Sequence, residues 1–148
     1  MNKVTPYLWF NNNAHKAAEF YLKIFKDAAL TEVKNGPDGN FFAGTLELSG
    51  QKYILFNGGD YFKLNPSFSL YVDCETQEEV DYYWDEFIND GAVPSRCGWL
   101  VDAYGVSWQI IPKMLPQLLF SEHGDKARDA MLKMSKIIIK DIEEAVKK

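Results

Sequence analysis

The chain has 148 residues, of which 47% are hydrophobic, and it carries a formal net charge of −5. These values fit one globular domain with a substantial core and exclude a basic nucleic-acid-binding surface. No apolar run reaches the roughly 20 residues of a membrane span, and the start lacks the apolar segment of a signal peptide. We therefore expect a cytoplasmic protein in which Cys74 and Cys97 are reduced thiols.

The first half of the chain predicts a strand, a helix and three further strands, over residues 5–10, 14–26, 30–34, 41–48 and 51–56. Thr5, Tyr7 and Trp9 alternate onto one face of the first strand. Asparagine is a favoured N-cap residue, so the asparagines at 11–13 are expected to begin the helix.

The second half repeats this order of elements. Its helix is expected to run from a capping box at Thr76 to Gly91. Residues 7–27 also resemble residues 69–89 at a constant offset of 62 positions, without a gap. Such a repeat indicates two similar supersecondary units, and we expect a site where they meet. The predicted strands of this half are 66–73, one or two short strands within 93–100, and 106–111.

Beyond Pro112 the repeat stops and helices are predicted. Asp125 is expected to cap a helix over 126–134, and a last helix is expected over 139–147. We interpret this tail as an addition that covers a sheet or a partner subunit. The predicted fold class is α+β, a single domain over 1–148 with a first unit over 1–57, a linker over 58–65, a second unit over 66–112 and a helical tail over 113–148.

Several segments carry a family resemblance, namely 5–10, 74–81, 97–100 with Asp102, 104–109 and 130–134. They resemble the PhnB-like branch, often labelled as a 3-demethylubiquinone-9 3-methyltransferase domain, of the vicinal oxygen chelate superfamily, which includes glyoxalase I and bleomycin-resistance proteins. The resemblance implies tandem β-α-β-β-β units whose sheets curve around a cleft. The label is not evidence of methyl transfer, because the turns into both helices lack the glycines that a nucleotide-type methyl donor usually needs.

The superfamily resemblance also implies where a divalent metal would bind. Its members typically use one residue near the start and one near the end of each unit, usually His and Glu. The matching positions here are Thr5, Ile54 (Tyr53 if the frame slips by one), Ser67 and Gln109. None is a good ligand for zinc, nickel or iron, so we expect neither a bound metal nor another cofactor.

Gln109 is the most informative candidate residue. It alternates with Ser107 on the last strand and is expected to point into the concave face, largely buried together with Ser67. There its amide would hydrogen-bond a neutral ligand or bind a metal weakly. The alternative is a buried amide satisfied by its neighbours. Trp108 points the other way, under the helices. The expected ligand-binding set is Thr5, Tyr7, Ile54, Ser67, Ser69, Trp99, Ser107 and Gln109, with Trp99 facing either the cavity or a dimer partner.

The sequence thus predicts a small-molecule-binding protein whose ligand is unknown and whose catalytic residues, if any, are not identified. The alternatives are an enzyme (a lyase, isomerase or oxygenase acting on a small carbonyl or aromatic compound in the same cleft) and a protective sequestering protein. We expect a homodimer formed through the short middle strands of the second unit and residues 115–120. The alternative is a monomer whose tail folds back over its own sheet. No nucleic-acid or membrane partner is expected.

Overall fold

The computed structural model describes residues 3–148, so Met1 and Asn2, which begin the predicted first unit, lie outside the described residues. The chain divides into two compact units between Leu64 and Asn65, and each unit has its own four-stranded sheet. The assignment of both units to one domain stays a prediction.

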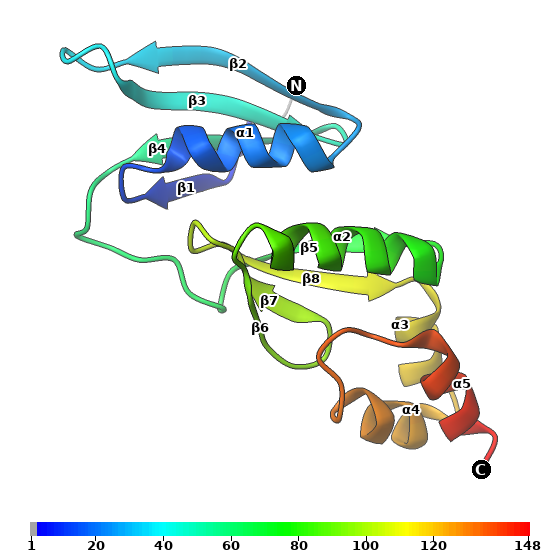
Figure 1. The fold of residues 1–148 in the computed structure, drawn as a ribbon. Coiled ribbons are helices and arrows are strands. Elements are labelled where there is room, and N and C mark those ends of the chain that lie inside the picture. Colours follow the sequence, from blue (N-terminus) through cyan, green and yellow to red (C-terminus); the bar gives the residue numbers. More distant parts are fainter. Residues whose placement is uncertain (1–2) are drawn as a thin grey trace. The chain divides into compact units, whose positions relative to one another are not determined.

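The first unit contains β1 (Tyr7–Phe10), α1 (Ala14–Ile24), β2 (Ala28–Asn35), β3 (Phe41–Leu48) and β4 (Gln51–Asn57). Its strands lie in the order β1-β4-β3-β2, with β1 parallel to β4 and the other neighbours antiparallel (Figure 1). One face packs against α1, where Leu8, Leu55 and Tyr21 are buried. Tyr7 and Trp9 alternate onto the opposite face, as predicted.

The start of α1 differs from the prediction. Asn13 occupies the N-cap, but its side chain makes no capping hydrogen bond. The side chain of Asn57 instead accepts a hydrogen bond from the Ala14 N–H at 2.9 Å and donates one to the Phe41 carbonyl at 3.0 Å. The end of β4 therefore holds the helix start, which a local capping pattern does not reveal. The helix also ends at Ile24 rather than at residue 26.

The second unit repeats this architecture. Before its tail it contains β5 (Ser69–Cys74), α2 (Gln77–Asn89), β6 (Val93–Pro94), β7 (Trp99–Val101) and β8 (Ser107–Pro112). The strand order β5-β8-β7-β6, with β5 parallel to β8, is equivalent to that of the first sheet. The predicted α+β class with tandem β-α-β-β-β units is confirmed.

Two predicted strands begin later than expected. The first strand starts at Tyr7, so Thr5 precedes it, and β5 starts at Ser69. Ser67 lies in the turn before β5 with an exposed side chain. Its backbone N–H donates to the side-chain oxygen of Asn65 at 2.8 Å, an interaction typical of turns. The prediction that Ser67 is a largely buried strand residue is therefore wrong.

The capping box at the start of α2 is confirmed. The Thr76 hydroxyl accepts a hydrogen bond from the Glu79 N–H at 3.2 Å, and the Glu79 carboxylate accepts one from the Glu75 N–H at 2.8 Å. The helix buries an apolar stripe against the sheet, where the rings of Phe87 and Trp108 lie 4.9 Å apart. The predicted core position of Trp108 is thus confirmed.

The tail consists of α3 (Met114–Leu119), α4 (Gly124–Met131) and α5 (Ile139–Val146). We did not predict α3, which is short and has no side-chain cap. The predicted cap at Asp125 is wrong, because α4 begins after His123 and Asp125 pairs with Arg128 at 2.8 Å. A separate core holds the tail together, formed by the buried residues Ile111, Leu115, Ala127, Ile137 and Ile142.

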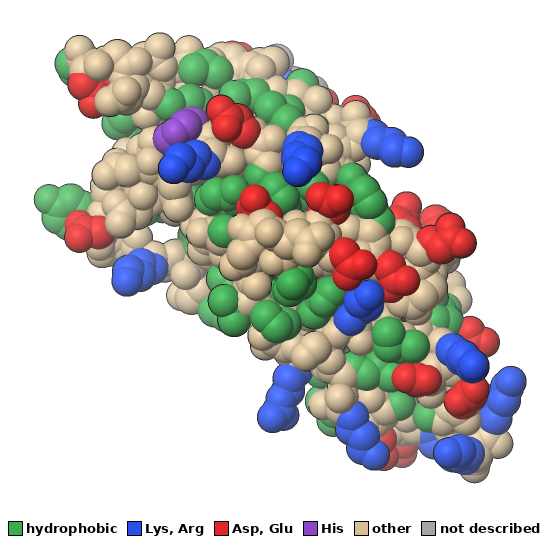
Figure 2. Space-filling model, in the orientation of Figure 1, with side chains coloured by type: hydrophobic (Ala, Val, Ile, Leu, Met, Phe, Trp, Pro, Cys, Tyr) green, Lys and Arg blue, Asp and Glu red, His purple; other side chains and the backbone are tan. Residues whose placement is uncertain are grey.

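Charge on the second unit is unevenly distributed. In Figure 2, acidic side chains gather over α2, whereas the tail carries basic and acidic side chains together. Opposite charges of these two elements meet where Lys136 pairs with Asp81 at 3.1 Å and with Asp85 at 3.4 Å. Within residues 3–148, no helix is both long enough and apolar enough to cross a membrane.

Candidate functional site

The second sheet presents two different faces. Trp108 and Ile110 on β8 are buried on the face that packs against α2. The intervening β8 residues lie on the opposite face. We call this opposite face the Gln109 face, and its members on β5, β7 and β8 are Ser69, Tyr71, Asp73, Trp99, Val101, Ser107, Gln109 and Ile111.

Gln109 lies at the centre of this face. Its strand partners are Tyr71 on β5 and Trp99 on β7. The Gln109 Nε2 donates a hydrogen bond to the Ser69 hydroxyl at 2.9 Å. That bond uses neither the amide oxygen nor the second amide hydrogen, so the side chain retains one acceptor and one donor for a ligand.

Ser107 provides a second polar group on the same face. Its side chain is only 2% exposed, and its hydroxyl oxygen has no hydrogen-bond partner among the described residues. Leaving a buried polar group unpaired costs about 1–3 kcal/mol. Such groups call for a specific explanation, such as a water or a ligand. The predicted arrangement of Ser107 and Gln109 on one face is confirmed.

A cavity of about 410 Å³ lies between the Gln109 face and the tail. The sheet and the loop before β7 contribute Tyr71, Cys97, Trp99, Gln109 and Ile111, and the tail contributes Leu115, Pro116, Leu119, Phe120 and Met131. Apolar and aromatic groups dominate this lining, and the Gln109 amide is its one carboxamide. A small cavity with apolar walls and a few polar groups is typical of a small-molecule site. We call it the tail cavity.

Tyr71 adds no charge to this lining at neutral pH. Burial, reinforced by Asp73 and Cys74, raises the pKa of the Tyr71 hydroxyl. A tyrosine hydroxyl is protonated at neutral pH even at its ordinary pKa of about 10, so it can donate a hydrogen bond. On the opposite face of β5, burial with Glu79 and Asp73 raises the pKa of Cys74 to about 12. Both cysteines are free thiols, as predicted.

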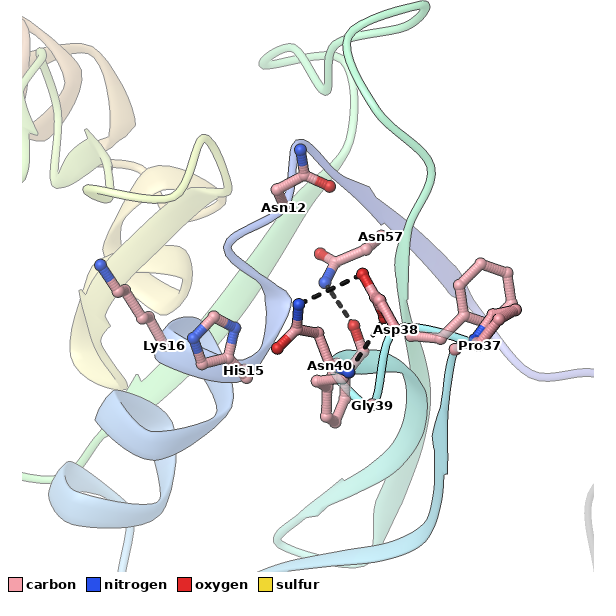
Figure 3. A pocket seen from close by; sticks show the side chains of 11 residues that line it. Asn12, His15, Lys16, Pro37, Asp38, Gly39, Asn40 and Asn57 are labelled. Carbon is pink, nitrogen blue, oxygen red and sulfur yellow. Dashed lines mark hydrogen bonds between the residues drawn. The ribbon is translucent and has the colours of Figure 1, made fainter.

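A larger hollow, of about 960 Å³, lies in the first unit between the start of α1 and the β2–β3 turn. Figure 3 shows Asp38 bonded to Asn40, and the Asn57 side chain bonded to nearby backbone. The Asp38 carboxylate accepts hydrogen bonds from the backbone and side chain of Asn40 at 3.0 and 3.2 Å. The Asn57 amide is occupied in holding α1 and β3. Because these groups serve the local fold, we place the candidate site in the second unit.

The predicted site residues of the first unit lie on or beside one sheet face. Tyr7 pairs with Ile54 in the parallel register, and Thr5 is half-buried just before β1. On this face the Phe56 ring lies 5.3 Å from Tyr7 and 5.2 Å from Trp9. Much of the aromatic content of the first unit therefore packs here. A ligand-binding role for these residues stays a prediction, as it does for Ser67.

The residues at the superfamily's metal positions do not fit a divalent metal. Ile54 has no donor atom, and Ser67 lies on an exposed turn. Gln109 and Thr5 offer only neutral oxygen or nitrogen atoms. Over residues 3–148 there is no cluster of three or more His, Cys, Asp or Glu side chains suited to a metal. We derive no metal-dependent step at these positions.

Sequence reasoning found the polar centre of the tail cavity but not its walls. Of the predicted residues, Trp99 and Gln109 line the cavity, and Ser69 binds Gln109. Tyr71 was missed, although its alternation with Ser69 on one strand was a usable signal. Residues 115–120 of the tail were predicted as a dimer contact and not as cavity walls, because α3 is a short helix without a cap.

Comparisons with known proteins identify relatives of this architecture. A family model described as 3-demethylubiquinone-9 3-methyltransferase matches residues 2–111. The chain is 32% identical to a PhnB protein from Bacillus cereus, described as a candidate 3-demethylubiquinone-9 3-methyltransferase, with a TM-score of 0.65 over 73% of this chain and 97% of that chain. It is also similar to protein PA1353 from Pseudomonas aeruginosa, with 15% identity and a TM-score of 0.60 over 73% and 95% of the two chains. No curated protein matches significantly.

Proposed function

We propose that this chain, which belongs to the PhnB-like family described as 3-demethylubiquinone-9 3-methyltransferase, binds a small neutral molecule in the tail cavity. The identity of the ligand is unknown. The observation that supports the proposal best is the Gln109 amide, held by Ser69 at 2.9 Å in a largely apolar cavity. A bound molecule with one hydroxyl or carbonyl group would satisfy both the amide and the apolar walls.

The family description names a methyl transfer, but no methyl-transfer step follows from this chain. Methyl donors of the nucleotide type bind at Gly-rich strand-to-helix turns of doubly wound parallel sheets. Each sheet here has one parallel pair, and the segments that lead into α1 and α2 contain no glycine. Binding without methyl transfer is the function that this geometry supports.

The hydrogen-bonding role of Gln109 can be tested with 2-naphthol as a probe. The Gln109→Leu variant keeps a similar side-chain volume but removes the amide, and we expect it to bind 2-naphthol about tenfold more weakly, since one hydrogen bond contributes about 1 kcal/mol or more. Ligand-detected NMR titration measures the dissociation constant. Adding a chelator should leave the affinity of the wild type unchanged, because the proposed site uses no metal.

Naphthalene, which has the same rings without the hydroxyl, is the matched control ligand. The wild type and Gln109→Leu should bind naphthalene with similar affinities, because only the amide contact differs between them. Equal binding of 2-naphthol by both proteins would contradict the role of Gln109. Failure of the wild type to bind either compound would contradict the proposed site itself.

We also propose that the chain forms a homodimer through the segments predicted from the sequence. In support, Val93 in β6 is 65% exposed and Phe120 at the end of α3 is 93% exposed. Light scattering at micromolar concentration should give twice the chain mass of 17.0 kDa. A mass of one chain would overturn this proposal. The superfamily placement and the cytoplasmic location likewise stay predictions.

A further inference from the structure

We infer that the C-terminal tail, residues 113–148, is part of the ligand site and not only a structural addition to the second unit. This inference rests on the proposed function, and it assigns the ligand's apolar contacts to α3 and α4. The family model ends at residue 111, so the tail lies beyond the segment that the family match covers. The tail nevertheless supplies half of the residues that line the tail cavity.

The tail forms a preformed wall, because it is attached to the sheet and to α2 by backbone and side-chain bonds. The N–H groups of Cys97 and Gly98 donate to the carbonyls of Met134 and Ser135, both at 2.8 Å. These bonds join the loop before β7, which carries the cavity residue Cys97, to the segment that follows α4. The position of the wall is thus set without a ligand.

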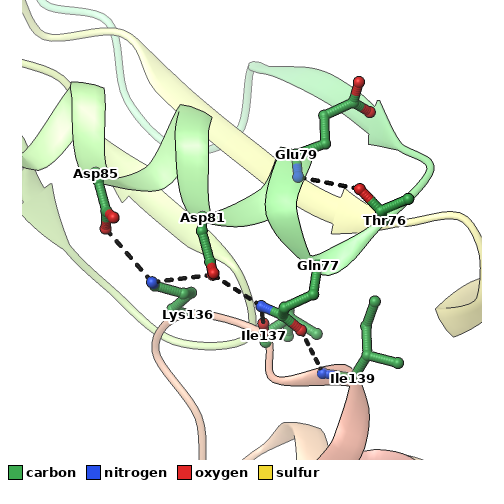
Figure 4. A network of polar contacts seen from close by, with 8 residues as sticks. All are labelled: Thr76, Gln77, Glu79, Asp81, Asp85, Lys136, Ile137 and Ile139. Carbon is green, nitrogen blue, oxygen red and sulfur yellow. Dashed lines mark hydrogen bonds and ion pairs between the residues drawn. The ribbon is translucent and has the colours of Figure 1, made fainter.

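Gln77 forms a second attachment, which Figure 4 shows. Its side-chain oxygen accepts from the Ile139 N–H at 2.7 Å, and its Nε2 donates to the Ile137 carbonyl at 3.0 Å. The same Nε2 donates to Asp81 at 2.9 Å, and that carboxylate also pairs with Lys136. The hydrogen bond from Gln77, with the Lys136 contact, lowers the pKa of Asp81. The pair is therefore charged at neutral pH and holds the tail against α2.

The chemistry of the wall indicates the class of ligand. Leu115, Leu119 and Met131 offer only apolar side chains, and they face a sheet whose lining residues include Tyr71, Trp99 and Gln109. A charged ligand would lose its hydration without gaining a partner of opposite charge in this lining. We therefore expect a neutral, largely apolar ring compound whose one polar group points to the sheet and whose ring edges contact the tail.

Met131 allows a sharp test, because the neighbouring Leu132 is 49% exposed and is not among the cavity residues. Met131→Trp fills the cavity from the tail side. We expect this variant to bind 2-naphthol at least about tenfold more weakly, which corresponds to about 1.4 kcal/mol of binding free energy. Leu132→Trp adds the same ring next to the cavity, and its affinity should stay within about twofold of the wild type. Thermal melts of both variants report whether the fold is retained.

A measurement on the wild type removes any dependence on how Met131→Trp folds. With 13C-labelled methionine methyl groups, 2-naphthol should shift the Met131 signal, which a Met131→Leu variant assigns. If Gln109→Leu weakens binding but the Met131 signal does not move and Met131→Trp binds normally, the tail is not part of the site, while small-molecule binding at Gln109 stands. If the wild type does not bind 2-naphthol at all, the proposed function fails and this inference fails with it.

Discussion

Replacing Asp102 with asparagine is expected to lower the free energy of unfolding by about 2–3 kcal/mol, the cost of a buried donor that loses a charged acceptor. Asp102 is 5% exposed. Its Oδ1 accepts hydrogen bonds from the N–H groups of Tyr104 and Val106, both at 2.9 Å, and its Oδ2 accepts one from the Trp108 indole at 2.8 Å. An asparagine has only one oxygen, so in either orientation its NH2 group faces a donor.

The matched control is Asp90→Asn in the same part of the second unit. Asp90 is exposed and accepts a hydrogen bond from the Tyr104 hydroxyl at 2.7 Å, which an asparagine oxygen can also accept. This variant should change the free energy of unfolding by less than about 0.5 kcal/mol, as is usual for surface substitutions. Urea unfolding measures both variants. Equal, small effects would show that Asp102 does not hold the turn before β8 to the core.

Replacing Gly98 with alanine is expected to destabilise the protein by about 2–5 kcal/mol, from backbone strain and from overpacking together. Gly98 has a φ of +85°, and an added Cβ would lie 2.8 Å from Ile111 Cδ1, 2.9 Å from the Ile110 carbonyl and 3.0 Å from Ile137 Cγ1. The carbonyl belongs to β8 and cannot move without disturbing the sheet. Ile137 belongs to the tail, so the substitution should also loosen the wall of the tail cavity.

Gly105→Ala separates the two causes. Gly105 has a φ of +100°, but an added Cβ would have no neighbour within 4 Å. It should therefore show only the strain of the left-handed conformation, about 1–2 kcal/mol. Gly98→Ala should lose more free energy of unfolding than Gly105→Ala. The difference measures how closely the loop before β7 approaches β8 and the tail. Equal losses in calorimetric melts of the two variants would contradict that close approach.

The fold was predictable because its signals are local and occur twice. The capping box at Thr76 and the hairpin turn at 49–50 appear in the structure where the sequence indicated them. The predictions are wrong where contacts between residues far apart in the sequence determine the local structure. Asn57 caps α1 from the end of β4, and nothing near Asn13 in the sequence reveals this. Likewise, Asn65 turns the chain before Ser67 can join a strand.

The candidate site was predictable only on the sheet. Alternation along β8 placed Gln109 and Trp108 on opposite faces, and the structure agrees. The cavity itself depends on α3 and α4 packing over that sheet. No regular spacing of residues along the sequence indicates which helix side chains will face which strand residues. Met131 lies within the predicted helix over 126–134, but its place in the cavity beside Gln109 became visible only in three dimensions.

A crystal structure of the protein soaked with 2-naphthol tests the proposed site most directly. The account predicts one molecule in the tail cavity, with its hydroxyl within hydrogen-bonding distance of the Gln109 amide and its rings between Trp99 and Met131. A molecule bound elsewhere on the chain, with the tail cavity empty, would contradict the account.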